Sequence, residues 1–258
     1  MGAPHGHTLH FHGHSLLHRI PAHAKLIGLL GVILVIVLTP RDYLLAFAGY
    51  AVIVSALVAL SQVPPSYVLR RLWPVLPFLL AALVLPIVAT GERVDVGPVS
   101  LAVEGLRGGL VLLLKVLLSA TLAVLFAATT EPRDLVRGLD QLRLPQPLVQ
   151  IMSFMLRYLE VVSDEVRRMS IALASRGFRA RSLRHWPVLA RTLGALFIRS
   201  FERGERVHLA MVSRGYTGRI PMQHHVATAR DWITVAVVPL LAAAALLVAM
   251  LVPLGRLP

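Results

Sequence analysis

The stretch GLVLLLKVLLSATLAVLFAA, residues 109–128, decides the fold. It contains no acidic residue, and Lys115 is its one charged residue. A helix needs about 20 predominantly apolar residues to cross the hydrocarbon core of a bilayer. We therefore expect residues 109–128 to form a membrane-spanning helix, in which the ammonium group of Lys115 extends toward the nearer membrane surface.

The composition agrees with a membrane protein. The chain has 258 residues, of which 56% are hydrophobic and 15% charged, and its mean hydropathy is +0.72. Soluble domains are about half apolar and about a quarter charged. A disordered chain is excluded, because such chains are poor in apolar residues, and an ordinary soluble enzyme is disfavoured. The absence of cysteine excludes disulfides, thiol catalysis and cysteine-ligated metals.

Four further apolar runs occur along the chain, at residues 24–39, 43–60, 73–89 and 232–253. The first is short and the third contains three prolines. Residues 1–23 are polar and do not have the pattern of a signal peptide. We predict an all-α, polytopic integral membrane protein with about five transmembrane helices and a cytoplasmic set of amphipathic helices.

The charges predict the orientation of these helices. The chain has 26 Lys and Arg against 13 Asp and Glu, and residues 129–231 carry 17 arginines against nine acids. Basic segments stay in the cytoplasm, so residues 129–231 and 61–72 are expected there, and the acidic loop 90–108 outside. A basic chain can also bind nucleic acid, but in a chain this apolar we favour cytoplasmic loops. The N-terminus is then cytoplasmic and the C-terminus external.

The large basic segment has the periodicity of amphipathic helices, over residues 130–144, 147–175 and 187–213. They either form a bundle that covers its own core, or pack under the membrane spans and present a polar face to a partner. The predicted domains are a His-rich tail (1–23), a membrane domain of four spans (24–128), a cytoplasmic helical domain (129–231), and the last span with an external C-terminus (232–258).

The last two of these helices end in the same motif. Residues 172–178 read ALASRGF and residues 210–216 read AMVSRGY, 38 positions later. A glycine just after a helix adopts the left-handed conformation that ends it, and arginine suits the negative end of the helix dipole. An ordinary helix cap would explain either motif taken alone. Capping does not, however, require the same serine and arginine at both helix ends. The repeat suggests two matching sockets on a dimeric or pseudo-dimeric partner, where the arginine fork pairs with a carboxylate.

With this repeat, the chain resembles the transmembrane T component of energy-coupling-factor (ECF) transporters over nearly its whole length. The paired Arg-Gly motifs are the most specific part of the resemblance. Other matching stretches are HRIPAHAKL (18–26), where His23 departs from the family pattern, EGL (104–106), TEPRDL (130–135), LP (144–145) and LRY (156–158).

The resemblance implies a scaffold that is not itself an enzyme. Its coupling helices would dock in grooves on two cytoplasmic ATPase subunits, and ATP-driven motion would reach a separate substrate-binding membrane (S) subunit, with a small accessory membrane subunit in some complexes. The chain would bind no cofactor and no nucleic acid, and ATP would be used by the partners. It would lie in a bacterial or archaeal cell membrane. By position, the coupling residues would be Ser175, Arg176, Gly177, Ser213, Arg214 and Gly215.

The main alternative is a secondary transporter driven by an ion gradient. A phosphate-binding P-loop needs a Gly-Lys pair, and neither Lys25 nor Lys115 follows a glycine, so the energy comes from another subunit or a gradient. Secondary transporters commonly place Asp, Glu or His within their spans, and the five apolar runs contain none. A membrane enzyme or a nucleic-acid-binding protein is disfavoured, because no catalytic cluster is evident.

The N-terminal tail is rich in histidine, at positions His5, His7, His10, His12 and His14. Imidazole binds cobalt, nickel, copper and zinc, so we expect weak metal binding here, although incidental histidines in a spacer are the alternative. The overall layout is most similar to the cobalt/nickel branch of the family, usually called CbiQ. Biotin or another vitamin is the alternative substrate.

Overall fold

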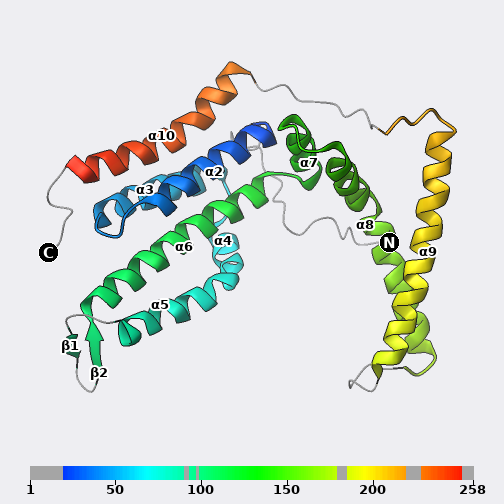
Figure 1. The fold of residues 1–258 in the computed structure, drawn as a ribbon, viewed down its shortest axis with the longest axis horizontal. Helices are drawn as coiled ribbons and strands as arrows, with labels where there is room; N and C mark the ends of the chain where they lie inside the picture. Colours follow the sequence, from blue (N-terminus) through cyan, green and yellow to red (C-terminus); the bar gives the residue numbers. More distant parts are fainter. Residues whose placement is uncertain (1–19, 90–92, 97–98, 179–184, 219–227, 252–258) are drawn as a thin grey trace. The chain divides into compact units, whose positions relative to one another are not determined.

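The computed structural model describes residues 20–89, 93–96, 99–178, 185–218 and 228–251 (Figure 1). The chain divides into two compact units. The first, called the membrane unit below, is Met1–Gly138 with His225–Pro258, and the second, the hairpin unit, is Leu139–His224. The fold is predominantly helical, and the prediction of an all-α polytopic membrane protein is confirmed.

Each of the five predicted apolar runs forms helix in the membrane unit. The elements of this unit are α2 (Ala22–Leu38), α3 (Leu44–Ser61), α4 (Pro65–Arg71), η1 (Trp73–Val75), α5 (Leu76–Val88), β1 (Arg93–Val96), β2 (Val99–Ala102), α6 (Val103–Thr129) and α10 (Ala229–Leu251). Helix α7 (Pro132–Gln141) crosses the boundary between the units.

Three or four of the five predicted spans have the length and composition of a membrane-spanning helix among the described residues. Among the described residues, α3, α6 and α10 are long and apolar enough. The segment containing α4, η1 and α5 adds a fourth span if it crosses as one, but it bends by 43°, at a position where Pro74 and Pro77 interrupt helical hydrogen bonding. Helix α2 is apolar and has 17 residues, the shortest length that spans a bilayer, and with it the membrane unit has the five segments predicted.

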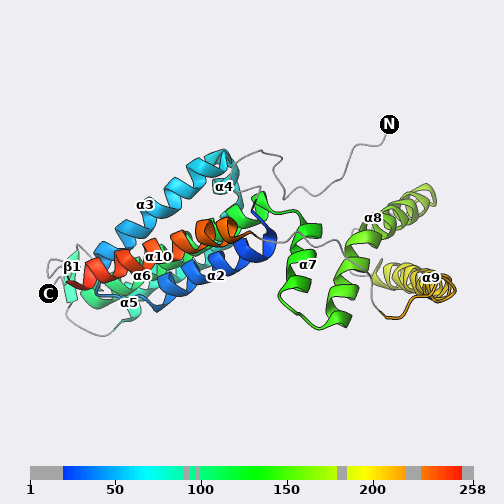
Figure 2. The same cartoon turned by 90° about the horizontal axis from the view of Figure 1, so that it is seen from above.

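Helices α2, α3, α6 and α10 form a four-membered ring, in which α2 and α3 each contact both α6 and α10. Figure 2 shows α2 and α3 on opposite sides of α10, and α6 lies behind α10 in this view. The core lies in the half of this ring that contains the end of α2 and the start of α3. Ile36, Phe47 and Tyr50 are fully buried there, and the hydroxyls of Thr39 and Tyr50 are hydrogen-bonded at 2.8 Å.

Small residues allow the closest helix contacts. Gly105 and Gly109 lie one turn apart on α6 and face α5, and a Cβ at Gly109 would lie 2.5 Å from the carbonyl oxygen of Ala82. A Cβ at Gly28 of α2 would lie 2.5 Å from the Val235 side chain of α10. Such small residues at i and i+4 are typical of membrane helix interfaces, where the backbones approach closely.

The segment predicted as an acidic external loop, residues 90–108, contains a short antiparallel hairpin that the sequence analysis missed. Strand β1 pairs with β2, and Arg93 lies opposite Ala102. Helix α6 follows directly and begins at Val103, earlier than the predicted start at residue 109. It therefore includes Glu104 and Arg107 in its first turns.

The hairpin unit contains α8 (Gln146–Ser175) and α9 (Trp186–Val212), and both predicted ranges were correct to within a residue. The two helices are antiparallel. Glu165 in the second half of α8 accepts a hydrogen bond at 2.8 Å from Arg199 in α9, whereas Gln150 at the start of α8 is bonded to Tyr216, just after α9. Figure 1 shows the two helices running in opposite directions.

Candidate functional site

The first Ser-Arg-Gly motif ends α8. We call residues 175–178 tip one. Gly177 has φ +75°, its amide donates to Ala174 O at 3.0 Å, and the Phe178 amide donates to Leu173 O at 3.0 Å. These two bonds are the Schellman motif, in which a left-handed residue satisfies the last carbonyls of a helix. The predicted glycine cap is therefore present at tip one.

The second motif repeats this geometry at the end of α9. We call residues 213–216 tip two. Gly215 has φ +85°, its amide donates to Val212 O at 3.0 Å, and the Tyr216 amide donates to Met211 O at 3.0 Å. The side chain of each serine bonds to its own helix, Ser175 to Ile171 O and Ser213 to Ala210 O, both at 3.0 Å. The repeated sequence therefore makes the same backbone turn twice.

The arginine of each tip is exposed. Within the part of the chain that the structure describes, the guanidinium groups of Arg176 and Arg214 form no ion pair. An arginine in the last turn interacts favourably with the helix dipole, but it keeps its five N–H donors for another partner. Both tips thus present a charged fork that can bind a carboxylate in two-pronged fashion.

The antiparallel arrangement places the two tips at opposite ends of the hairpin unit. Helix α9 has 27 residues, which corresponds to about 40 Å at 1.5 Å per residue. The two tips are therefore separated by roughly the length of one helix. A partner that held both arginines in matching sockets would need two binding sites facing opposite ends of the helix pair.

The apolar faces of α8 and α9 are exposed as well. Val149 is the one buried residue of α8, and α9 has none. Large apolar side chains with at least 46% exposure are Leu148, Ile151, Met155, Leu159, Val166 and Ile171 on α8, and Trp186, Leu193, Phe197, Ile198, Phe201, Leu209 and Val212 on α9. Exposed apolar area on this scale is typical of interaction surfaces. The two helices therefore do not cover an apolar core between them, as a self-contained bundle would.

Two lysines of the membrane unit bind helix carbonyls. The Lys25 ammonium group donates to Thr129 O at 2.8 Å and Thr130 Oγ1 at 3.4 Å, at the end of α6. The Lys115 ammonium group donates to Val37 O at 2.8 Å, at the end of α2. The final carbonyls of a helix lack helical partners and carry negative partial charge. Both lysines thus join one helix to the end of another, which the sequence analysis did not predict.

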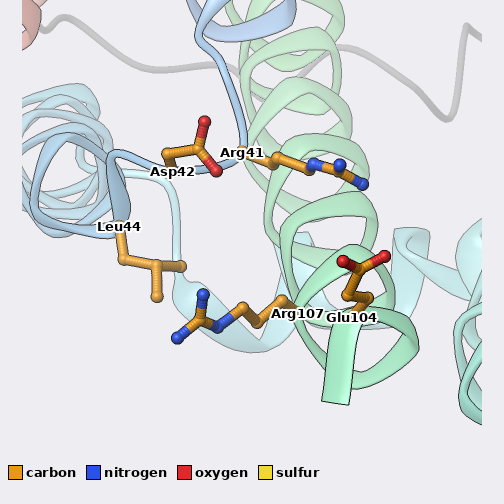
Figure 3. Close-up of a pocket in the computed structure, with 5 residues that line it drawn as sticks. All are labelled: Arg41, Asp42, Leu44, Glu104 and Arg107. Carbon is orange, nitrogen blue, oxygen red and sulfur yellow. The ribbon is translucent and has the colours of Figure 1, made fainter. Parts of the chain in front are cut away.

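A small charged pocket of about 90 Å³ lies at the opposite end of α6 from Thr129. Figure 3 shows Arg41 and Asp42 from the α2–α3 connection beside Glu104 and Arg107 of α6. Its two basic and two acidic groups balance in charge, and it contains no nucleophile paired with a base. We therefore assign no chemistry to it.

The described residues contain no group of three or more His, Asp or Glu side chains that could hold a metal ion. The predicted metal-binding histidines, His5, His7, His10, His12 and His14, lie outside the described residues.

Comparison with known proteins identifies the family. A family model described as CbiQ, cobalt transport protein, matches residues 13–226. The chain is 30% identical over 223 residues to the energy-coupling factor transporter transmembrane protein EcfT of Listeria innocua, covering 80% of this chain and 82% of that protein. It is 29% identical over 255 residues to the EcfT protein of Bacillus subtilis, covering 91% and 94% of the two chains. This chain therefore belongs to the CbiQ cobalt transport protein family and is a transmembrane T component of an energy-coupling-factor transporter.

Proposed function

We propose that this chain is the non-catalytic scaffold that carries ATP-driven motion from two cytoplasmic ATPase subunits to a substrate-binding membrane subunit. One observation carries the proposal: the same Ser-Arg-Gly turn occurs at both ends of an antiparallel helix pair. Two ends of such a pair are related by an approximate twofold rotation, and a pair of like ATPase subunits presents its binding sites with the same symmetry. Each tip then docks on one subunit.

Within this proposal, Arg176 and Arg214 form the contacts with the ATPases. Gly177 and Gly215 end the helices so that each arginine lies at the tip, and Ser175 and Ser213 satisfy helix carbonyls beside it. An arginine that only caps a helix contributes about 0.3–1 kcal/mol to stability. An arginine paired with a carboxylate in a desolvated groove contributes about 2–5 kcal/mol to binding. The difference in magnitude separates the two roles experimentally.

The proposed orientation follows from the arginine bias of residues 129–231. The hairpin unit and the N-terminus lie in the cytoplasm, where ATP is available. The cargo proposed for the whole transporter is cobalt or nickel, on the basis of the family description. The N-terminal histidines bind such ions weakly, and calorimetry on a peptide of residues 1–23 tests this. Absence of heat at millimolar metal and neutral pH would contradict it.

The experiment for the coupling role is the double variant Arg176→Ala/Arg214→Ala, assembled with the ATPase and membrane subunits of its host. We expect loss of ATPase pull-down, or ATP hydrolysis no longer coupled to metal uptake in proteoliposomes, while the variant still inserts in the membrane. The matched control is Arg167→Ala/Arg191→Ala, which removes the same charge from exposed positions of the same two helices. Normal assembly and uptake in the tip variant would contradict the proposal.

Replacement by lysine refines the same test. Arg176→Lys and Arg214→Lys keep the positive charge but lose the planar fork. We expect partial recovery of ATPase binding relative to alanine. Full recovery would show that charge alone suffices, and that no two-pronged contact with a carboxylate is made.

A further inference from the structure

Helices α2, α3, α6 and α10 line an apolar cavity of about 530 Å³ that is open on one side. All four helices contribute to its walls, including Gly28, Leu57, Leu122, Leu125 and Val238. Its volume lies within the range of about 300–1,000 Å³ that is typical of small-molecule sites. The cavity occupies the half of the ring that contains the start of α2, and the tightly packed core occupies the other half.

The cavity opens between α3 and α10. These helices contact each other, and Figure 2 shows them close together at one end and farther apart toward the other. The most exposed side chains of the cavity wall lie on them, with Val52 at 67% and Leu60 at 56% on α3, and Val237 at 44% and Leu241 at 53% on α10. Both helices are long and apolar enough to span the bilayer. The opening therefore faces lipid, and an acyl chain can enter it from the membrane.

Lys25 is the one charged residue in the wall of this cavity. Its ammonium group uses two donors on neutral acceptors, Thr129 O and Thr130 Oγ1, and a lysine has three donors. It forms no ion pair within the described residues, and the nearby Asp134 carboxylate is paired with Arg137 at 2.9 Å. A positive charge with a donor to spare thus lies at one end of an apolar chamber.

We propose that this cavity binds one anionic phospholipid, with an acyl chain between α3 and α10 and the phosphate group beside Lys25. An apolar helix of a partner would fill the cavity, but it would leave the Lys25 charge unpaired in a nonpolar site. An unpaired charge in such a site costs free energy. A soluble anion would neutralise the Lys25 charge but leave the apolar cavity unoccupied. An anionic amphiphile satisfies both. Under the orientation proposed above, its headgroup belongs to the cytoplasmic leaflet.

Arg230 extends the positive charge along the same face of α10. It is exposed and lies one turn before Thr234, which lines the cavity. Residues four apart on a helix are neighbours on its surface. Arg230 is therefore placed near the headgroup level, and Thr234 cannot replace it as a donor because its hydroxyl donates to Arg230 O at 2.8 Å.

The test uses tryptophan quenching by brominated lipids in the full-length chain. Trp73, Trp186 and Trp232 are replaced by phenylalanine, and Leu57→Trp places a single reporter in the cavity wall. The protein is reconstituted in mixed vesicles of phosphatidylcholine and phosphatidylglycerol, with bromine on the chains of one lipid or the other. We expect phosphatidylglycerol to occupy the site about fivefold more readily, the ratio expected for one cation beside an anionic lipid. Val237→Trp, on the other side of the opening, should report the same ratio.

Substitution of Lys25 decides the outcome. Lys25→Gln keeps a donor for Thr129 O but removes the charge beside the phosphate, so the ratio should fall and leave only the contribution of Arg230, whereas Lys25→Arg should retain it. Lys115→Gln, which removes the other lysine, should leave the ratio unchanged. Circular dichroism shows whether each variant keeps its helices. Equal quenching by both lipids in the parent, a ratio that Lys25→Gln leaves unchanged, or no quenching at residue 57 would each overturn the proposal.

Discussion

The two tips of the hairpin unit have the same backbone but are held in place differently. At tip one, the ring of Phe178 packs edge-on against the ring of His185, and the two ring centroids lie 5.3 Å apart. His185 belongs to the same α8–α9 connection. At tip two, the Tyr216 hydroxyl donates to Gln150 Oε1 of α8 at 2.6 Å, and the Gln150 amide donates to Gly218 O. Tip one is thus held by its own connection, and tip two is tied to the neighbouring helix.

This difference separates two functions of one motif. The Ser-Arg-Gly sequence determines the direction of the arginine at both tips, because it determines the turn. The aromatic residue that follows determines how firmly the turn is attached, because only tyrosine has a hydroxyl that can reach across to α8. We therefore expect the tips to respond alike to changes in the turn and differently to changes in the aromatic residue.

The largest expected effect concerns the side of the membrane on which both tips lie. The chain has no cysteine, so single cysteines report accessibility cleanly. Ser175→Cys and Ser213→Cys should both resist an impermeant maleimide in intact cells, whereas Asp42→Cys, in the exposed α2–α3 connection, should react. All three should react after the cells are permeabilised. Labelling of either tip from outside, or protection of residue 42, would contradict the proposed orientation.

The next effect concerns the turn. Gly177 and Gly215 have positive φ, and a Cβ at either would meet nothing within 4 Å. Valine at either position would cause no steric clash with other residues. Its cost is that of holding a residue with a Cβ in the left-handed conformation, about 1–2 kcal/mol. Gly177→Val and Gly215→Val should each weaken ATPase pull-down about tenfold. Gly→Asn is the control, since asparagine tolerates the left-handed region. If ATPase pull-down weakened for only one of the two valine variants, the two turns would not be equivalent.

A smaller effect should distinguish the tips. Tyr216→Phe gives tip two the aromatic residue of tip one and removes a hydrogen bond of about 0.5–1.5 kcal/mol. We expect hydrogen exchange at the Gly215 and Tyr216 amides to accelerate about two- to tenfold, toward the rate at Gly177 and Phe178. The reciprocal Phe178→Tyr variant should change little. Unchanged exchange in Tyr216→Phe would mean that the bond to Gln150 does not hold tip two.

The sequence predicts the turns but not their attachment. A glycine after a periodic helix is a local signal, and it correctly located both Schellman motifs. The Tyr216–Gln150 and Lys25–Thr129 contacts join residues 66 and 104 positions apart, and such pairs depend on how helices pack. The third predicted run, residues 73–89, begins just after the 43° bend between Arg71 and Trp73, so hydropathy located the apolar segment but not α4, which precedes it. The alternating apolar residues of β1 and β2 were too few to distinguish a hairpin from a loop.

The smallest expected effect lies between the tips, at the ion pair that joins the two helices. Glu165 accepts hydrogen bonds from Arg168 of its own helix and from Arg199 of α9, both at 2.8 Å. These bonds hold the pKa of the Glu165 carboxyl below its ordinary value. A carboxylate whose pKa is lowered in the folded state stabilises it fully above the ordinary pKa, and this contribution is lost as the pH falls through the lowered value. The α8–α9 contact should therefore loosen on acidification below about pH 4.

Spin labels at the exposed positions Ser163→Cys and Ser200→Cys measure this loosening as a broader distance distribution. Glu165→Gln should give the broad distribution at neutral pH and remove its dependence on pH. Glu202→Gln is the control, because Glu202 pairs with Arg206 within α9 and does not join the helices. Since tip two keeps its bond to Gln150, hydrogen exchange should accelerate more at tip one than at tip two when Glu165 is replaced. Equal acceleration at both tips would show that the Gln150 contact gives tip two no independent attachment to α8.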